Sequence, residues 1–206
     1  MMKSTLLAVI FIGCATLPAG AAELSKTYSY FSIGGNTLDE IEAELARRGP
    51  NVKNSGKRHP GATQMEFVAR LGYSEGAGSC QIVQANVTVK AKMILPRWRR
   101  PGKAKQDVRL IWDTLSADIK RHEESHVVIA KNYAREIEQT LKKTGRQADC
   151  QVAAAKAKQT TATILAKHDR AQQQFDRVEG INFESRIMRL LKYRLEQIDA
   201  GRLTSR

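Results

Sequence analysis

Hydrophobic residues recur at steps of three and four between about Gln106 and Lys143, and this period predicts one long amphipathic helix. His122 and His126 fall in the same apolar stripe, so both imidazoles are expected to face the core. The other members of the stripe are Val108, Ile111, Trp112, Leu115, Ile119, Ile129, Tyr133, Ile137 and Leu141. A second helix is expected at about 148–178. A third, with Ile187, Leu190, Leu191, Leu195 and Ile198 as its apolar residues, closes the chain.

The front of the chain alternates apolar and polar residues, which is typical of strands. The clearest strand is CQIVQANVTVKAKMILP, where Val87, Val89, Ala91 and Met93 share one face and Thr88, Lys90 and Lys92 share the other. Two further strands are expected at 26–33 and 64–73. Between them, TLDEIEAELARRGP predicts a short helix with a capping box from Thr37 to Glu40. The predicted fold class is α+β: a small antiparallel sheet packed on a bundle of about three C-terminal helices.

The first residues have the pattern of a cleaved secretory signal. Lys3 precedes a short apolar run, and the small residues GAA follow it. We therefore expect a signal peptide at 1–22 and a single domain at 23–206, exported to the periplasm or cell exterior. The apolar run is too short to span a membrane, so no transmembrane segment is expected after cleavage. The alternative is a lipoprotein anchored at Cys14.

Cys80 and Cys150 remain as a pair whichever way the N-terminus is processed. An even pair of cysteines in an exported chain favours a disulfide between them. The alternative is two buried thiols.

The chain is strongly basic, with 34 Lys and Arg against 21 Asp and Glu and a net charge of +13. Such a charge attracts anionic partners, and an anionic envelope surface is one that the basic face could bind. Nucleic acid is not the expected partner, because the basic run around Trp98 is typical of a solvated loop with one Trp packed on the core. His59 lies in the polar loop GKRHPG and is expected to be exposed to solvent.

Within the long helix, His122, Glu123 and His126 form an H-E-x-x-H motif. Residues four apart lie on one helical face, so both imidazoles can reach one zinc ion at about 2.0–2.1 Å. Glu123 adjoins the first histidine, where a carboxylate can accept a proton from attacking water and return it to the leaving amine. The motif predicts a zinc site with its own general base. The alternative is two hydrogen-bonded histidines at a helix interface.

Several segments beyond the motif carry a family resemblance: YSYFSIGGNTLDEIEAELARRGP, SCQIVQANVTVKAKMILPRW, HEESHVVIAKNYAREIEQTL, Cys150 and QQQFDRVEG. Over about 28–198, the chain resembles the domain of unknown function 922 family, exported bacterial proteins described as zinc-dependent proteases. The resemblance implies a zincin-like active-site helix, one zinc ion per chain and peptidase activity. It implies no particular substrate.

A catalytic zinc ion usually has three protein ligands, so a third is required. Relatives tend to carry an aromatic-Asp pair followed by Thr-x-His-Gly, whereas this chain keeps Phe175 and Asp176 but has Ile181 where that histidine is expected. Asp176 is the preferred third ligand because it retains the family position. The alternatives are Glu179, His168 and, with less support, Glu184. An unbroken helix would place His168 and Asp176 about 12 Å apart, so only one of them can bind the metal.

Two functions remain open, with an exported nucleic-acid binder as a third, weaker hypothesis. The favoured one is a zinc-dependent metallopeptidase that acts on a peptide or protein through Glu123. The other is a catalytically inactive, zinc-stabilised protein that attaches to the envelope through its cationic surface.

Overall fold

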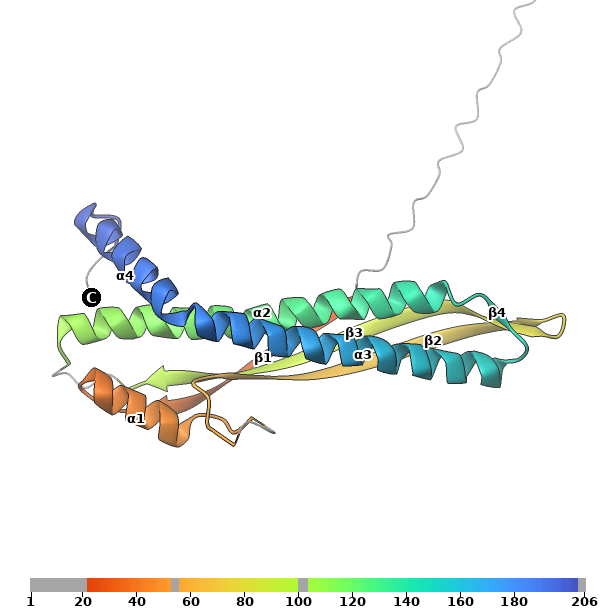
Figure 1. The fold of residues 1–206 in the computed structure, drawn as a ribbon, viewed down its shortest axis with the longest axis horizontal. Helices are drawn as coiled ribbons and strands as arrows, with labels where there is room; N and C mark the ends of the chain where they lie inside the picture. Colours follow the sequence, from red (N-terminus) through yellow and green to blue (C-terminus); the bar gives the residue numbers. More distant parts are fainter. Residues whose placement is uncertain (1–21, 53–55, 100–103, 204–206) are drawn as a thin grey trace, which may run out of the picture.

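The computed structural model describes residues 22–52, 56–99 and 104–203. Nearly all of the expected signal sequence, with Cys14, lies outside these ranges. In chain order the elements are β1 (Glu23–Ile33), α1 (Leu38–Arg48), β2 (Ala62–Gly76), β3 (Ser79–Trp98), α2 (Gln106–Lys142), β4 (Arg146–Gln147), α3 (Cys150–Ile181) and α4 (Phe183–Asp199). Figure 1 shows α2 running along the length of the sheet, while α4 points away from the rest of the structure.

The sheet has the strand order β1-β3-β2, and the short β4 pairs with the start of β3. β2 and β3 form a hairpin closed by Ala77 and Gly78, whose φ angles of 50° and 69° are those of a two-residue type I′ turn. The α+β class is confirmed, with one difference: β1 runs parallel to β3, so the sheet is mixed. Two reversals of direction, through α1 and through the hairpin, separate β1 from β3 and give them the same direction.

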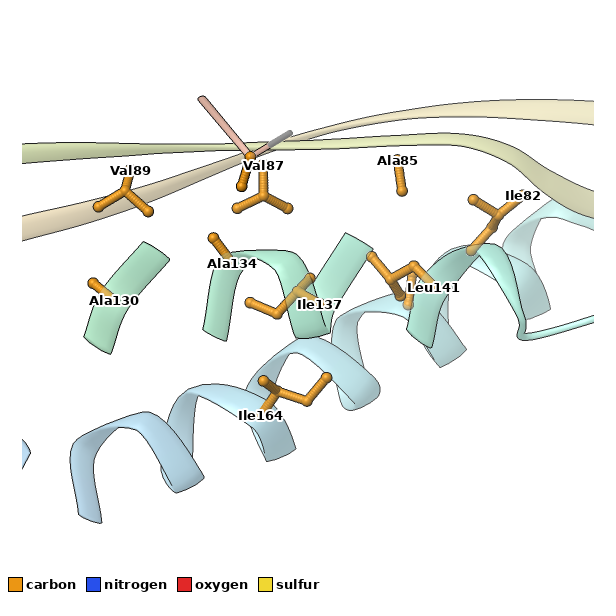
Figure 2. Packing of buried hydrophobic residues seen from close by; sticks show 11 residues of the cluster. Ile82, Ala85, Val87, Val89, Ala130, Ala134, Ile137, Leu141 and Ile164 are labelled. Atoms are coloured by element: carbon orange, nitrogen blue, oxygen red, sulfur yellow. The ribbon is translucent and has the colours of Figure 1, made fainter. Parts of the chain in front are cut away.

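The alternation seen in the β3 sequence separates a buried face from an open one. Val87, Val89, Ala91 and Met93 are buried, whereas Lys90 and Lys92 are exposed. Figure 2 shows Val87 and Val89 facing Ala130, Ala134 and Ile137 of α2, with Ile164 of α3 behind them. Small residues on α2 at this contact let the helix lie close to the sheet. The core therefore fixes α2 along the centre of the sheet and sets the direction in which its histidines point.

Cys80 and Cys150 form a disulfide, as predicted. The bond joins the start of β3 to the first residue of α3, where Asp149 caps the helix by accepting a hydrogen bond from the Val152 amide at 2.7 Å. α3 then continues without a break to Ile181 and carries Asp176 past the histidines of α2. Across the described ranges, no helix combines the length and the apolar character that a membrane span requires.

Candidate metal centre

His122 and His126 lie one turn apart on α2, and their Nε2 atoms are 3.1 Å from each other. The two rings meet edge to face, with centroids 4.7 Å apart. Phe175 of α3 packs against both rings at centroid distances of 5.0 Å. The helical stripe therefore delivers two imidazole nitrogens to one point, on the side of α2 that faces α3.

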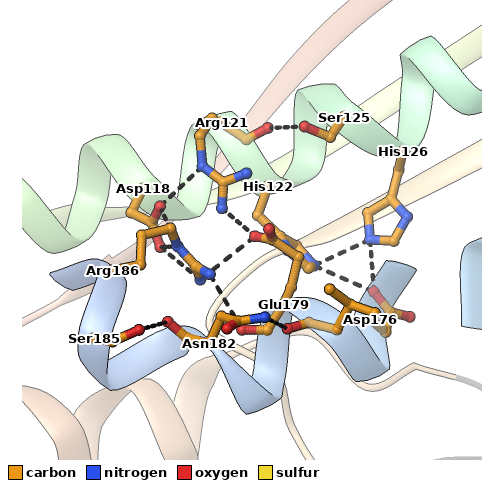
Figure 3. A network of polar contacts seen from close by, with 11 residues as sticks. Asp118, Arg121, His122, Ser125, His126, Asp176, Glu179, Asn182, Ser185 and Arg186 are labelled. Carbon is orange, nitrogen blue, oxygen red and sulfur yellow. Dashed lines mark hydrogen bonds and ion pairs between the residues drawn. The ribbon is translucent and has the colours of Figure 1, made fainter. Parts of the chain in front are cut away.

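Asp176 of α3 brings a carboxylate oxygen to the same point. Its Oδ1 lies 3.1 Å from Nε2 of His126 and 3.3 Å from Nε2 of His122 (Figure 3). These three residues form the His/Cys/Asp/Glu group that the described chain offers for a metal ion, with all of their ligand atoms within 4.8 Å of one another. Three atoms bound at about 2.0–2.1 Å in a tetrahedron lie about 3.3–3.4 Å apart, so the observed separations fit a zinc ion.

Gln172 fixes the orientation of the His126 ring. Its Nε2 donates to the His126 backbone carbonyl at 3.1 Å, and since a carbonyl can only accept, the amide orientation is determined. Its Oε1 then lies 2.6 Å from Nδ1 of His126, which must carry the proton. In the neutral ring the lone pair is therefore on Nε2, the nitrogen that faces Asp176; in the protonated ring Nε2 donates to Asp176.

Glu179 has the corresponding position beside His122, with Oε2 3.5 Å from Nδ1. Glu179 is also paired with Arg121 and, at 3.4 Å, with Arg186 of α4. Burial opposes its ionisation, but the hydrogen bond from Arg121 and the nearby guanidinium charges hold the pKa of Glu179 below its usual value. The geometry makes Glu179 an orienting partner of His122, because it contacts the ring nitrogen that points away from Asp176.

Asp118 anchors the same network from α2. Its carboxylate is 4% exposed and accepts from Arg121 at 2.9 Å and from Arg186 at 3.1–3.2 Å. Figure 3 shows these side chains between α2 and the junction of α3 with α4. Arg186 therefore ties the start of α4 to the helix that carries both histidines.

Glu123 is buried, with 4% of its surface exposed, and it lies beside the first residues of β2. Oγ1 of Thr63 donates a hydrogen bond to Oε2 of Glu123 at 2.8 Å. Gly61 leaves room for the carboxylate, because a Cβ atom there would lie 2.8 Å from Oε1 of Glu123. Burial raises the pKa of Glu123, although the Thr63 hydrogen bond and the nearby histidines act in the opposite direction.

The charges of the candidate ligands are matched to one another. Burial opposes ionisation of Asp176, but hydrogen bonds from His122 and His126 hold its pKa well below the usual range. Burial alone would lower the pKa of His126, yet hydrogen bonds to Asp176 and Gln172 raise it above its usual value. A bound cation would take the place of the hydrogen bonds and charges that pair Asp176 with the two histidines.

A cavity of about 460 Å³ opens beside these groups, within the size range of ligand sites. Its walls come from Val52, residues 59–63 and Met65, from α2, and from the end of α3 and the start of α4. His122, Glu123, His126 and Asp176 all line it. The candidate ligands and the buried carboxylate therefore share one cavity.

The sequence model of a bacterial family of unknown function, DUF922, matches residues 28–184. The chain belongs to the DUF922 family. No curated protein and no solved structure matches it. The DUF922 match begins within β1, covers the rest of the sheet, α2 and α3 with His122, His126 and Asp176, and ends just after α4 begins.

The structure separates the third-ligand candidates of this DUF922 chain. Asp176 joins the two histidines, whereas Glu179 orients His122 from the far side of its ring. His168 is buried and reaches the site indirectly, with its Nε2 2.8 Å from Nε2 of Gln172. Glu184 is exposed, and so is Ile181, at 77%. A histidine at position 181 is therefore not needed to complete a three-ligand group.

The sequence analysis missed two residues that support the candidate site and misjudged the environment of a third. Gln172 and Thr63 carry no motif, and only their contacts with His126 and Glu123 reveal them. The expectation for His59 was wrong: it is partly buried and lines the cavity, because the loop folds back over Glu123.

Proposed function

We propose that this chain is an exported zinc-dependent metallopeptidase, with one zinc ion held by His122, His126 and Asp176 and with Glu123 as the general base. The observation that carries the proposal is the convergence of three ligand atoms, separated by 3.1–3.3 Å, in the cavity that also contains a buried carboxylate. Two imidazoles and one carboxylate are ligands that suit zinc.

Zinc held by these residues would acidify the attacking water and polarise the substrate carbonyl group. Glu123 would accept the proton of that water and transfer it to the leaving amine. Thr63 holds the carboxylate in place through its contact with Oε2.

Two histidines and a carboxylate are also the ligands of some non-haem iron oxygenases. The buried Glu123 beside the first ligand favours hydrolysis instead, since an oxygenase site has no need of a base there. The cavity also offers apolar contacts from Val52, Pro60, Met65 and Phe183, which suit the side chains of a peptide. The disulfide supports export, because such bonds persist in oxidising compartments.

The second candidate, an inactive zinc-stabilised protein that binds the envelope, has the net charge of +13 in its favour. The open face of the sheet gives it weaker support than its sequence suggests, because Glu66 lies 3.5 Å from Lys90 on that face. A surface with paired charges attracts anions less than a purely cationic one.

Replacement of Glu123 by Gln separates the two. Peptide hydrolysis, followed with casein and a fluorogenic peptide library, should fall by at least about a hundredfold while the zinc content stays unchanged. Glu124→Gln is the matched control, one residue further along α2, and should keep its rate. Equal rates in the Glu123→Gln and wild-type proteins, or no hydrolysis by either, would leave the envelope-binding function as the better description.

A further inference from the structure

His59 differs from the other three histidines of the chain. In each of the other three, both ring nitrogens have partners. His122 contacts Glu179 and Asp176, and His126 contacts Gln172 and Asp176. His168 contacts Asp169 and Gln172. Within the described ranges, the His59 ring makes no hydrogen bond, and its Nε2 is a buried polar atom without a partner.

The backbone holds His59 in a fixed place on the cavity wall. Its amide donates to the Pro50 carbonyl at 3.0 Å, and the Arg58 side chain donates to the Gly49 carbonyl at 2.8 Å. The close approach needs glycine at position 49, because a Cβ there would lie 2.1 Å from the carbonyl oxygen of His59. The loop is thereby pressed against the C-terminal end of α1.

The residues that follow His59 contact Glu123, the proposed general base. Gly61 is in close contact with Glu123, and Thr63 donates to its carboxylate. His59 therefore lies two residues before the contact that places Glu123, and both side chains line the same cavity. The three-residue ligand group does not include His59, so the metal does not account for it.

A buried polar atom without a partner is unfavourable, and such atoms in native proteins call for an explanation. His59 lines the cavity, so an occupant of the cavity is a partner that its ring can reach by rotation. No hydrogen bond from a described residue restrains the ring, and the terminal torsion of histidine is broad, so rotation can turn either nitrogen toward such an occupant. A neutral imidazole offers one N–H donor, which suits a carbonyl oxygen.

We propose that His59 binds the substrate, by donating a ring N–H hydrogen bond to the carbonyl oxygen of the peptide bond on which Glu123 acts. This role rests on the peptidase function proposed above. The carbonyl oxygen gains negative charge as water adds to the carbon, and a positioned donor is worth more to that oxygen than to the ground-state carbonyl. His59 thus contributes to binding and, more strongly, to rate.

Kinetics of the zinc-loaded protein test the rate contribution. His59→Ala should lower kcat/KM about a hundredfold, mainly through kcat, with unchanged zinc content. His59→Gln keeps an N–H donor and should recover part of the loss. Lys57→Ala, an exposed neighbour outside the cavity, is the control and should retain the wild-type rate. Equal kcat/KM values in the wild-type and His59→Ala proteins would overturn the proposal.

Thermal unfolding separates a binding role from a structural one. Because the His59 ring makes no hydrogen bond in the described chain, His59→Ala should melt at or slightly above the wild-type temperature. A large fall in melting temperature in both the Ala and the Gln variants would show that His59 stabilises the loop instead.

Calorimetric binding of a phosphinic peptide, a tetrahedral mimic of the hydrated peptide bond, gives a readout that does not need turnover. The dissociation constant should rise at least tenfold in His59→Ala and less in His59→Gln. If the wild type binds this probe through His59 but hydrolyses nothing, the peptidase function fails and the binding role of His59 stands. If it hydrolyses peptides and His59→Ala binds the probe equally well, the role of His59 fails alone. If the wild type does not bind the probe, the proposal for His59 is overturned.

Discussion

Nδ1 of His126 lies 2.6 Å from Oε1 of Gln172, one helical turn before Asp176 on α3. The same helix therefore supplies both the candidate third ligand and the group that turns the His126 lone pair toward it. Partners of this kind commonly contribute ten- to a hundredfold to metal affinity.

Gln172→Leu should consequently weaken zinc binding by about ten- to a hundredfold, because His126 loses the acceptor that fixes its tautomer and ring orientation. Competition with a chromophoric chelator measures the affinity. Gln173→Leu changes an exposed neighbour on α3 and should leave it unaltered. Equal affinities in the two variants would contradict the role of Gln172.

Arg186→Ala should destabilise the protein by about 3 kcal/mol, since it leaves the buried Asp118 with Arg121 as its remaining cationic partner. Urea unfolding followed by circular dichroism measures the loss. Arg189→Ala removes an exposed arginine from the next turn of α4 and is expected to cost less than about 0.5 kcal/mol. A loss no larger than that of Arg189→Ala would show that α4 is not held by this ion pair.

Removal of the disulfide should lower the free energy of unfolding by about 4 kcal/mol, because Cys80 and Cys150 close a loop of 70 residues in the unfolded chain. The double variant Cys80→Ala, Cys150→Ala should unfold at lower urea concentration than the wild type. A reducing agent should shift the wild type toward the double variant and leave the double variant unchanged. Insensitivity of the wild type to reduction would contradict the bond.

The metal-free and zinc-loaded proteins should respond to pH in opposite directions. In the metal-free protein the pKa of His126 is raised, so its stabilising contribution is complete below about pH 6.5 and disappears as the pH rises through the folded-state value. Zinc binding requires the neutral ring and should strengthen over the same pH range.

Unfolding in EDTA from pH 5.5 to 8.5 tests the first half of this prediction, with His126→Gln as the reference. The stability difference between wild type and variant should shrink as the pH rises. A difference that grows with pH would contradict the assigned contact between His126 and Asp176.

Periodicity in the sequence was enough to predict the helices and the three long strands, though not the two-residue β4, because burial of one face imposes the same spacing wherever the element lies. The long helix was expected at about 106–143 and occupies Gln106–Lys142. The direction of β1 relative to β3 could not be read in this way, since alternation is the same in parallel and antiparallel pairs.

The residues of the candidate site likewise fall into those that the sequence predicted and those that it could not. His122, Glu123 and His126 are local in sequence, and helical geometry alone places the two histidines together. Asp176 required a family position and the length of α3 to be preferred over His168. Gln172 and His59 depend on how α3 packs on α2 and on the path of one loop, and neither leaves a pattern in the sequence.

The most direct test of the central claim is the zinc content of the purified protein after equilibration with zinc and removal of the excess. The wild type should retain close to one zinc ion per chain, and Asp176→Ala should retain much less, while Asp199→Ala, an exposed aspartate at the end of α4 and outside the ligand group, should match the wild type. A wild type without bound zinc, or an Asp176→Ala variant with the full amount, would contradict the assignment of His122, His126 and Asp176 as the metal ligands.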